Sequence, residues 1–191
     1  ERYGSFVGKR VAVIGQGPIG LLWVACLKRL GAKQIITIEP LDYRREYGLA
    51  QGADAAIDPI KSDPIEIITE LTNGELVDVV VEASGEPGSP QLAIEMAKMD
   101  GTVIPFGSPH PEAVEIKWYT MLQKRLKILT SYNASDPEPA GAVREAVALV
   151  KRGWIDLSWL VTHRFPMAEA ADAYRLYEER TDGSLKVIVQ V

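Results

Sequence analysis

The chain has 191 residues, of which 47% are hydrophobic and 25% charged, values that predict a globular protein with a core of ordinary size. Acidic and basic residues are interspersed and sum to a net charge of −5, which excludes a clustered basic surface for nucleic acid or anionic membrane. A single cysteine excludes an intrachain disulfide, and the lack of a signal-peptide pattern or a long apolar run favours a soluble, cytoplasmic protein.

Short β-branched segments alternate with longer amphipathic segments up to residue 130, a pattern typical of a parallel sheet covered by helices. We predict strands at residues 10–14, 34–39, 55–57, 77–82, 102–106 and 126–130. We predict the helices between them at residues 18–30, 43–51, 64–71 and 89–98. The expected fold class is therefore α/β, with a doubly wound, parallel, six-stranded sheet.

From about residue 137 the pattern changes, and a helix at 138–151 is followed by a short apolar stretch. A strand at 162–165, a helix at 167–179 and a strand at 186–191 complete the chain. This tail is too small to form a domain and is rich in aromatic residues for an appendage. We therefore expect a first domain at 1–152 and, at 153–191, a segment of a second domain whose remainder lies outside this chain.

A glycine-rich loop, residues 15–20 (GQGPIG), joins the first strand to the first helix. In that setting Gly15 permits the tight turn, Gly17 lets a pyrophosphate approach the backbone, and Gly20 lets the helix pack closely on the sheet. Pro18 suits the first helical turn, because its missing N–H would have no partner there. The motif predicts dinucleotide binding by a Rossmann fold, although on its own it also fits an ordinary glycine-rich turn.

An acidic residue, Glu39, ends the second predicted strand, where a carboxylate accepts hydrogen bonds from the adenosine ribose. That carboxylate would repel a 2′-phosphate, so we expect NAD to be preferred over NADP. Arg44 and Arg45 follow closely, and three roles are open to them. A guanidinium there could bind a 2′-phosphate, stack on the adenine or lie on the outer face of the second helix.

At these residues the sequence resembles the zinc-containing medium-chain dehydrogenase/reductase family, which includes alcohol, sorbitol and threonine dehydrogenases. The resemblance rests on six segments that occur in the order expected for the family: 11–20 (VAVIGQGPIG), 82–85 (EASG), 102–107 (TVIPFG), 162–166 (THRFP), 170–174 (AADAY) and 186–189 (KVIV). It covers essentially the whole chain. It implies a Rossmann domain followed by a C-terminal fragment of a GroES-like catalytic domain.

The resemblance implies that the loop faces the pyrophosphate and that Glu39 and Arg44 face the adenosine half of the cofactor. Residues 83–84 would approach it from the fourth strand, 106–107 would line the nicotinamide side, and 131–132 would lie near the carboxamide. For residues 131–132 an ordinary strand end is an equally good interpretation. The expected cofactor-binding residues are Gly15, Gly17, Pro18, Ile19, Gly20, Glu39, Arg44, Ala83, Ser84, Phe106, Gly107, Ser131 and Tyr132.

The zinc chemistry of this family needs a Cys, a His and a third ligand that is Cys, Asp or Glu, and the resemblance places these before the coenzyme loop. Cys26 lies among apolar helix residues and is expected to fill the core. His110 is expected in a Pro-flanked surface turn, and His163 in a tail motif that binds no metal in the family. We predict no catalytic residue and no metal ligand in this chain, and expect zinc only in a full-length parent protein. The chain would be a truncated or excised part of that parent, or else a naturally short coenzyme-binding protein.

For the complete enzyme, the expected reaction is oxidation of a secondary alcohol or polyol with hydride transfer to NAD⁺. The alternative is a stand-alone NAD-binding, redox-sensing module, which would have a polar tail surface rather than an exposed apolar patch. A short-chain dehydrogenase is excluded, because no tyrosine is followed by a lysine four residues later. A methyltransferase that uses S-adenosylmethionine would not be expected to carry this loop together with this tail.

Residues 113–118 alternate between apolar and charged side chains, as an edge strand does. In the family that region pairs with a second copy across a two-fold axis, so we expect a homodimer through 113–118. An ordinary surface loop is the other interpretation of the same residues.

Overall fold

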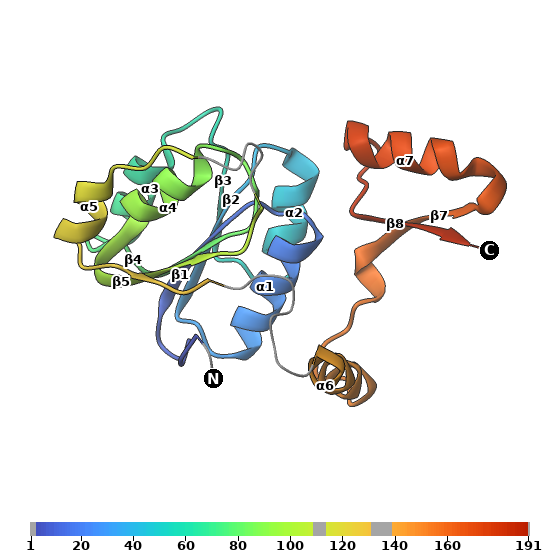
Figure 1. Cartoon of the computed structure of the whole chain (residues 1–191), viewed down its shortest axis with the longest axis horizontal. Coiled ribbons are helices and arrows are strands. Elements are labelled where there is room, and N and C mark those ends of the chain that lie inside the picture. Colours follow the sequence, from blue (N-terminus) through green and yellow to red (C-terminus); the bar gives the residue numbers. More distant parts are fainter. Residues whose placement is uncertain (1–2, 109–113, 131–138, 191) are drawn as a thin grey trace. The chain divides into compact units, whose positions relative to one another are not determined.

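The computed structural model describes residues 3–108, 114–130 and 139–190. The chain divides into two compact units, Glu1–Ala134 and Ser135–Val191 (Figure 1). Helix α6 (Pro139–Lys151) belongs by its contacts to the second unit, whereas the sequence places the boundary after residue 152. The domain boundary of the complete protein stays a prediction.

The N-terminal unit contains a six-stranded parallel sheet in the order β3-β2-β1-β4-β5-β6. Its strands are β1 (Arg10–Ile14), β2 (Gln34–Ile38), β3 (Ala55–Ile57), β4 (Val77–Glu82), β5 (Ala97–Pro105) and β6 (Lys127–Ile128). Its helices are α1 (Pro18–Arg29), α2 (Asp42–Ala50), α3 (Pro64–Leu71), α4 (Ser89–Met96) and α5 (Trp118–Gln123). The strand order reverses between β1 and β4, as in the doubly wound Rossmann arrangement, so the predicted fold class is confirmed.

Several bounds in this unit differ from the predicted ones, and α5 was not predicted. Helix α4 ends at Met96 instead of near 98, because Ala97 already pairs with Val77 and begins β5. Of the two interpretations of 113–118, an edge strand or a surface loop, the loop holds for residues 114–117, and Trp118 begins α5. There the Lys117 N–H donates to the Gln91 side-chain oxygen at 2.7 Å, which fastens the segment to α4 rather than to the sheet. Pairing of 113–118 with a second copy stays a prediction.

Alternate residues of the central strands pack on opposite faces of the sheet, as the two-residue period of a strand requires. Ala12 and Ile14 face a cluster that contains Ile68 of α3 together with α4 residues. Val11 and Val13 face a second cluster with α1. The two faces are therefore covered by different helices, and both sides of β1 are buried.

Asp78 links the strands at the amino-terminal end of the sheet. Its carboxylate accepts the Arg10 N–H at 2.7 Å and lies 2.6 Å from the Lys98 ammonium. Burial by itself would raise the pKa of Asp78, but the Lys98 ammonium and the Arg10 N–H hold that pKa below its ordinary value. The ionised carboxylate thus stabilises the folded chain.

Asp78→Asn is expected to lower the free energy of unfolding by about 1–2 kcal/mol at pH 7. Because the folded-state pKa is lowered, the stabilisation is present above the unfolded pKa of about 3.9 and disappears as pH falls through the folded value. Urea unfolding measured from neutral to acid pH should therefore show that the free energy of unfolding decreases less on acidification in the variant than in the parent. The control is Glu70→Gln, at an exposed position of α3, whose free energy of unfolding should vary with pH as it does in the parent. The same pH dependence in Asp78→Asn as in the parent would contradict the prediction.

The C-terminal unit contains a small β-α-β arrangement after α6. Strand β7 (Val161–Pro166) pairs in parallel with β8 (Lys186–Gln190), and α7 (Ala170–Glu179) connects them. A 3₁₀ turn at Met167–Glu169 occupies the beginning of the predicted helix 167–179, and a further 3₁₀ turn lies at Ser158–Leu160. Among all the residues described, no helix combines the length and the apolar character that a membrane crossing requires.

Candidate functional site

The glycine-rich loop lies at the carboxyl end of β1, next to the point where the strand order reverses. The Gly15 N–H donates to the Ile38 carbonyl at the end of β2, at 2.8 Å. The Ala83 N–H donates to the Ile14 carbonyl at 2.9 Å, which brings the chain after β4 to the other side of the loop. Such a switch point is where doubly wound sheets bind their ligands.

Gly15 and Gly20 are required by the fold itself. Gly15 has a φ of +86°, and a Cβ at this position would lie 2.8 Å from the Ser84 Cα. A Cβ on Gly20 would collide with the Gly15 carbonyl. These two glycines therefore shape the loop and seat α1 against the sheet.

Gly17 is not required by the fold. Its φ of −67° and ψ of −178° are ordinary extended values that any residue adopts. The nearest atom to an added Cβ is the Arg44 Nη1, at 3.9 Å. A methyl group would thus fit here in the protein alone, which leaves room for a ligand atom beside Gly17.

Helix α1 begins at Pro18, and its N-cap residue, Gly17, provides no side-chain hydrogen bond to the helix. The N–H groups of a first helical turn have no partner within the helix and carry the positive end of its dipole. Together with the open space above Gly17, they form a place suited to a phosphate group. Ile19, in the same helical turn, is 44% exposed and so is accessible to a ligand there.

Glu39 follows β2 and is 4% exposed, yet its carboxylate faces the loop. Its Oε2 accepts the Gln16 N–H at 2.7 Å, and its Oε1 accepts the Leu41 N–H at 3.1 Å. Each carboxylate oxygen can accept a further hydrogen bond. The carboxylate is thus held in one orientation next to the loop, where a ribose hydroxyl can donate to it.

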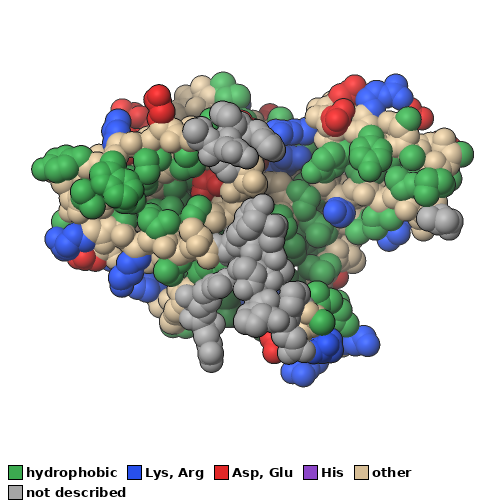
Figure 2. All heavy atoms as spheres, in the orientation of Figure 1, with side chains coloured by type: hydrophobic (Ala, Val, Ile, Leu, Met, Phe, Trp, Pro, Cys, Tyr) green, Lys and Arg blue, Asp and Glu red, His purple; other side chains and the backbone are tan. Residues whose placement is uncertain are grey.

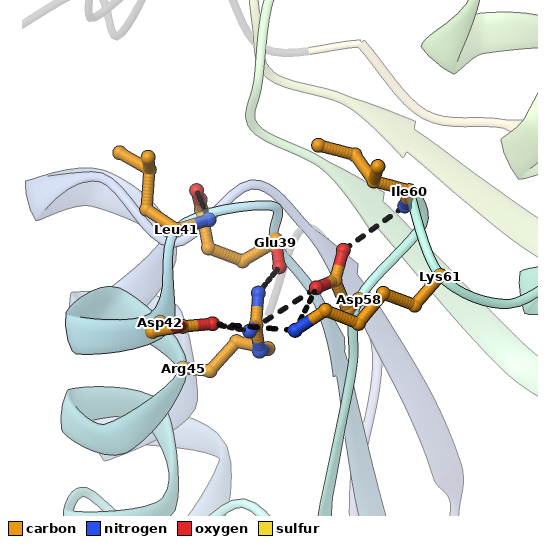
Figure 3. A network of polar contacts seen from close by, with 7 residues as sticks. All are labelled: Glu39, Leu41, Asp42, Arg45, Asp58, Ile60 and Lys61. Atoms are coloured by element: carbon orange, nitrogen blue, oxygen red, sulfur yellow. Dashed lines mark hydrogen bonds and ion pairs between the residues drawn. The ribbon is translucent and has the colours of Figure 1, made fainter.

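The two arginines of α2 have different surroundings. Arg44 is 8% exposed and reaches toward Gly17, and its Nε donates to the Tyr43 hydroxyl at 3.1 Å. Arg45 turns instead toward the carboxyl ends of β2 and β3, and its Nη1 donates to the Glu39 carbonyl at 2.7 Å (Figure 3). Arg44 can therefore contact a ligand above the loop, whereas Arg45 is held by the protein.

A buried carboxylate, Glu82, organises the turn after β4. It is 1% exposed, and its Oε1 accepts the Ser84 N–H at 2.8 Å and the Ser84 hydroxyl at 2.7 Å. The same oxygen accepts the Gly85 N–H at 3.0 Å and the Ser89 hydroxyl at 2.8 Å. Ala83 and Ser84 are thereby fixed beside Gly15.

The end of β5 is attached to the end of β4 through the main chain. The Glu82 carbonyl accepts the N–H groups of Phe106 and Gly107, each at 2.8 Å. The Phe106 ring is 38% exposed and meets Trp23 of α1 edge to face, with ring centroids 6.0 Å apart. The structure thus brings residues 106–107 to the same edge of the sheet as the loop.

Two residues of this region were not predicted from the sequence. Gln16 is fully buried, and its side-chain Nε2 donates to the Gly15 carbonyl at 2.8 Å. Glu82, described above, is the other. A signal existed for Glu82, because it is an acid that directly follows three apolar residues, 79–81, of a strand predicted to be central in the sheet. Gln16 occupies a variable position of the loop motif, which gives no such signal.

Ser131, Tyr132 and His110 lie outside the described residues. Cys26 is partly buried, and burial raises the pKa of its thiol against the opposing charge of Arg29. His163 lies in the C-terminal unit, with its Nδ1 2.9 Å from the Thr162 hydroxyl. Within residues 3–108, 114–130 and 139–190, no group of three or more His, Cys, Asp or Glu side chains is arranged to hold a metal ion.

Comparison with known proteins identifies a family and several relatives. The family model described as zinc-binding dehydrogenase matches residues 18–152. An L-threonine 3-dehydrogenase of Bacillus licheniformis is 34% identical over 186 residues, which cover 97% of this chain and 53% of that protein.

Solved structures share the fold. An alcohol dehydrogenase from Thermus sp. ATN1 matches with a TM-score of 0.87 and 29% identity, over 97% of this chain and 52% of that one. A zinc-binding dehydrogenase from Sinorhizobium meliloti 1021, solved with NADP, has a TM-score of 0.84 and 30% identity, over 98% of this chain and 54% of the other. The chain spans about half the length of the proteins that it matches.

Proposed function

The chain belongs to the zinc-binding dehydrogenase family, whose NAD(P)-binding domain it matches, and we propose that its loop binds NAD in preference to NADP. The observation that carries this proposal is Gly17. The fold requires the glycines on either side of it, at 15 and 20, but leaves open the space that a side chain at 17 would fill. A pyrophosphate over the loop explains why a glycine stands there.

The proposed coenzyme contacts follow the edge of the sheet. The first turn of α1 would hold the pyrophosphate, Arg44 would contact the adenosine half, and the Glu39 carboxylate would accept hydrogen bonds from the adenosine ribose. Ser84, Phe106 and Gly107 would position the nicotinamide half. Bound NAD would supply the hydride acceptor, and the chain's own residues would orient it and exclude water.

The proposed reaction of the complete enzyme is oxidation of a secondary alcohol or polyol. Similar proteins named threonine dehydrogenase and alcohol dehydrogenase support an alcohol as the substrate class. The described residues do not fit the zinc of this family, because they contain no group suited to hold a metal. We therefore assign no catalytic step to zinc in this chain.

NAD preference is supported by Glu39, because a carboxylate that is held beside the ribose repels a 2′-phosphate. A similar protein at 30% identity was solved with NADP, so NADPH is the coenzyme against which the proposal is tested. The comparison of the two coenzymes is therefore part of the experiment.

We expect the purified chain to bind NADH more tightly than NADPH, as followed by energy transfer from its tryptophans to the nicotinamide. Glu39→Ala should weaken NADH binding about tenfold, since two hydrogen bonds from the ribose are lost. NADPH binding should weaken less, because the same change removes a repulsion.

Glu70→Ala, the same substitution at an exposed position of α3, is the matched control and should bind both coenzymes like the parent chain. A folded chain that binds neither coenzyme would contradict the proposed function. Equal losses of NADH and NADPH binding in Glu39→Ala would contradict only the NAD preference.

The alternative, a stand-alone redox-sensing module, requires a polar surface on the C-terminal unit. Instead, apolar and aromatic side chains of α6 and α7 are exposed in this unit, and Figure 2 shows hydrophobic side chains on its visible face. These residues include Val143 at 63%, Tyr174 at 69% and Tyr177 at 53% exposure. Such a surface favours a segment of a larger catalytic domain over a self-sufficient module.

A further inference from the structure

A network of opposite charges lies at the carboxyl ends of β2 and β3, next to the proposed ribose position (Figure 3). Arg45 and Lys61 provide its positive charges, and Asp42 and Asp58 its carboxylates. We call these four side chains the charge network. Its contacts bear on whether the Arg45 and Lys61 side chains can bind a ligand near Glu39.

The Arg45 guanidinium is engaged on several sides. Its Nη1 donates to the Glu39 carbonyl at 2.7 Å, and its Nη2 pairs with Asp42 and lies 3.3 Å from the Asp58 Oδ2. The side chains of Arg45 and Asp58 are each 13% exposed, so this pairing is shielded from water. Arg45 therefore contacts the main chain of Glu39, the acid proposed to bind the ribose, but its hydrogen bonds and ion pairs are made within the protein.

Asp58 is the centre of the charge network. Its Oδ2 lies 3.3 Å from both the Arg45 guanidinium and the Lys61 ammonium, while its Oδ1 accepts the Ile60 N–H at 3.0 Å. Burial by itself would raise the pKa of Asp58, but the Ile60 N–H and the two cations hold that pKa below its ordinary value. Asp58 is thus ionised at neutral pH and neutralises two positive charges at once.

From these contacts we infer that Asp58, assisted by Asp42, is a specificity-determining residue that disfavours NADP by withholding Arg45 and Lys61 from a 2′-phosphate. The inference rests on the proposed function and adds a cause distinct from the repulsion by Glu39. A 2′-phosphate would have to draw Arg45 away from two carboxylates and a carbonyl. Lys61 is 70% exposed and its long side chain can turn, but the Asp58 carboxylate attracts it in the same way.

The inference is tested with Asp58→Asn in the full chain, using 2′,5′-ADP and 5′-AMP as probes that differ only in the 2′-phosphate. The variant should bind 2′,5′-ADP and NADPH about tenfold more tightly, because a released cation pairs with the phosphate. Binding of 5′-AMP and NADH should stay within about twofold of the parent, and the gain should shrink as salt is added. Adding Lys61→Met or Arg45→Met to this variant should remove part of the gain.

Glu70→Gln removes one negative charge from α3 and is the control for a general change in potential. If Asp58→Asn does not fold, Asp42→Asn replaces it, since the Asp42 side chain is 77% exposed, and it should give a smaller gain of the same kind. An equal gain for 5′-AMP and 2′,5′-ADP, or no gain for 2′,5′-ADP, would overturn the inference. Failure of the parent chain to bind NADH and 5′-AMP would instead refute the proposed function.

Discussion

Gly17→Ala is expected to weaken NADH binding about 10- to 100-fold while the melting temperature of the free chain stays within about 2 °C of the parent. The structure accommodates the new methyl group, since only the Arg44 Nη1 lies within 4 Å of it, at 3.9 Å. The backbone at Gly17 is extended and needs no glycine. The loss would therefore arise in the complex, where the methyl group displaces the pyrophosphate from the N–H groups of α1.

Two measurements on the same protein separate these effects: thermal melting without ligand, and titration with NADH. Gly88→Ala is the matched control, because Gly88 has a φ of −83° and no atom within 4 Å of an added Cβ. It should change neither quantity. Unchanged NADH binding by Gly17→Ala would mean that the pyrophosphate does not cross the loop at this residue.

Gly20→Ala is expected to lower the free energy of unfolding by about 3 kcal/mol. Its Cβ would collide with the Gly15 carbonyl, which belongs to a loop that Ser84 confines on another side. Helix α1 would have to move away from the sheet, and Leu21, Val24 and Leu27 are fully buried on it. The variant should also lose NADH binding, but as a consequence of the displaced helix.

Urea denaturation measures this effect as a lower midpoint with an unchanged slope. Gly88→Ala is again the control and should lie within about 0.5 kcal/mol of the parent. A stable Gly20→Ala that binds NADH normally would show that the helix can shift at little cost. Together, the two loop variants distinguish a glycine required by the fold from one required by the ligand.

The sequence alone predicted the elements that local pattern determines. The central strands of a parallel sheet are buried on both faces, so β1 and β4 contain apolar runs, at 11–14 and 79–81, and the bounds of both strands were predicted correctly. The loop could be recognised because its glycines occupy fixed positions between a strand and a helix. Glu39 could be recognised for a similar reason, since an acid at the end of the second strand is part of the same pattern.

The contacts that complete the site could not be predicted, because they join residues far apart in the chain. Nothing in the residues around Arg45 indicates that Asp58 will hold it, and the sequence therefore left the role of both arginines open. The alternation at 113–118 fits a strand or a loop equally well. At this segment the Lys117 N–H donates to the side chain of Gln91 in α4, a contact that the alternation does not reveal.

The alternate burial of β1 has a consequence for how the length of this chain can vary. Insertion or deletion of one residue within the strand would exchange its two sets of side chains, so that Ala12 and Ile14 would turn toward α1, and Val11 and Val13 toward α3 and α4. The same change would shift Gly15 and Gly20 out of the turn that they form. Single-residue changes in length should therefore be tolerated better in exposed connections than between Arg10 and Gly20.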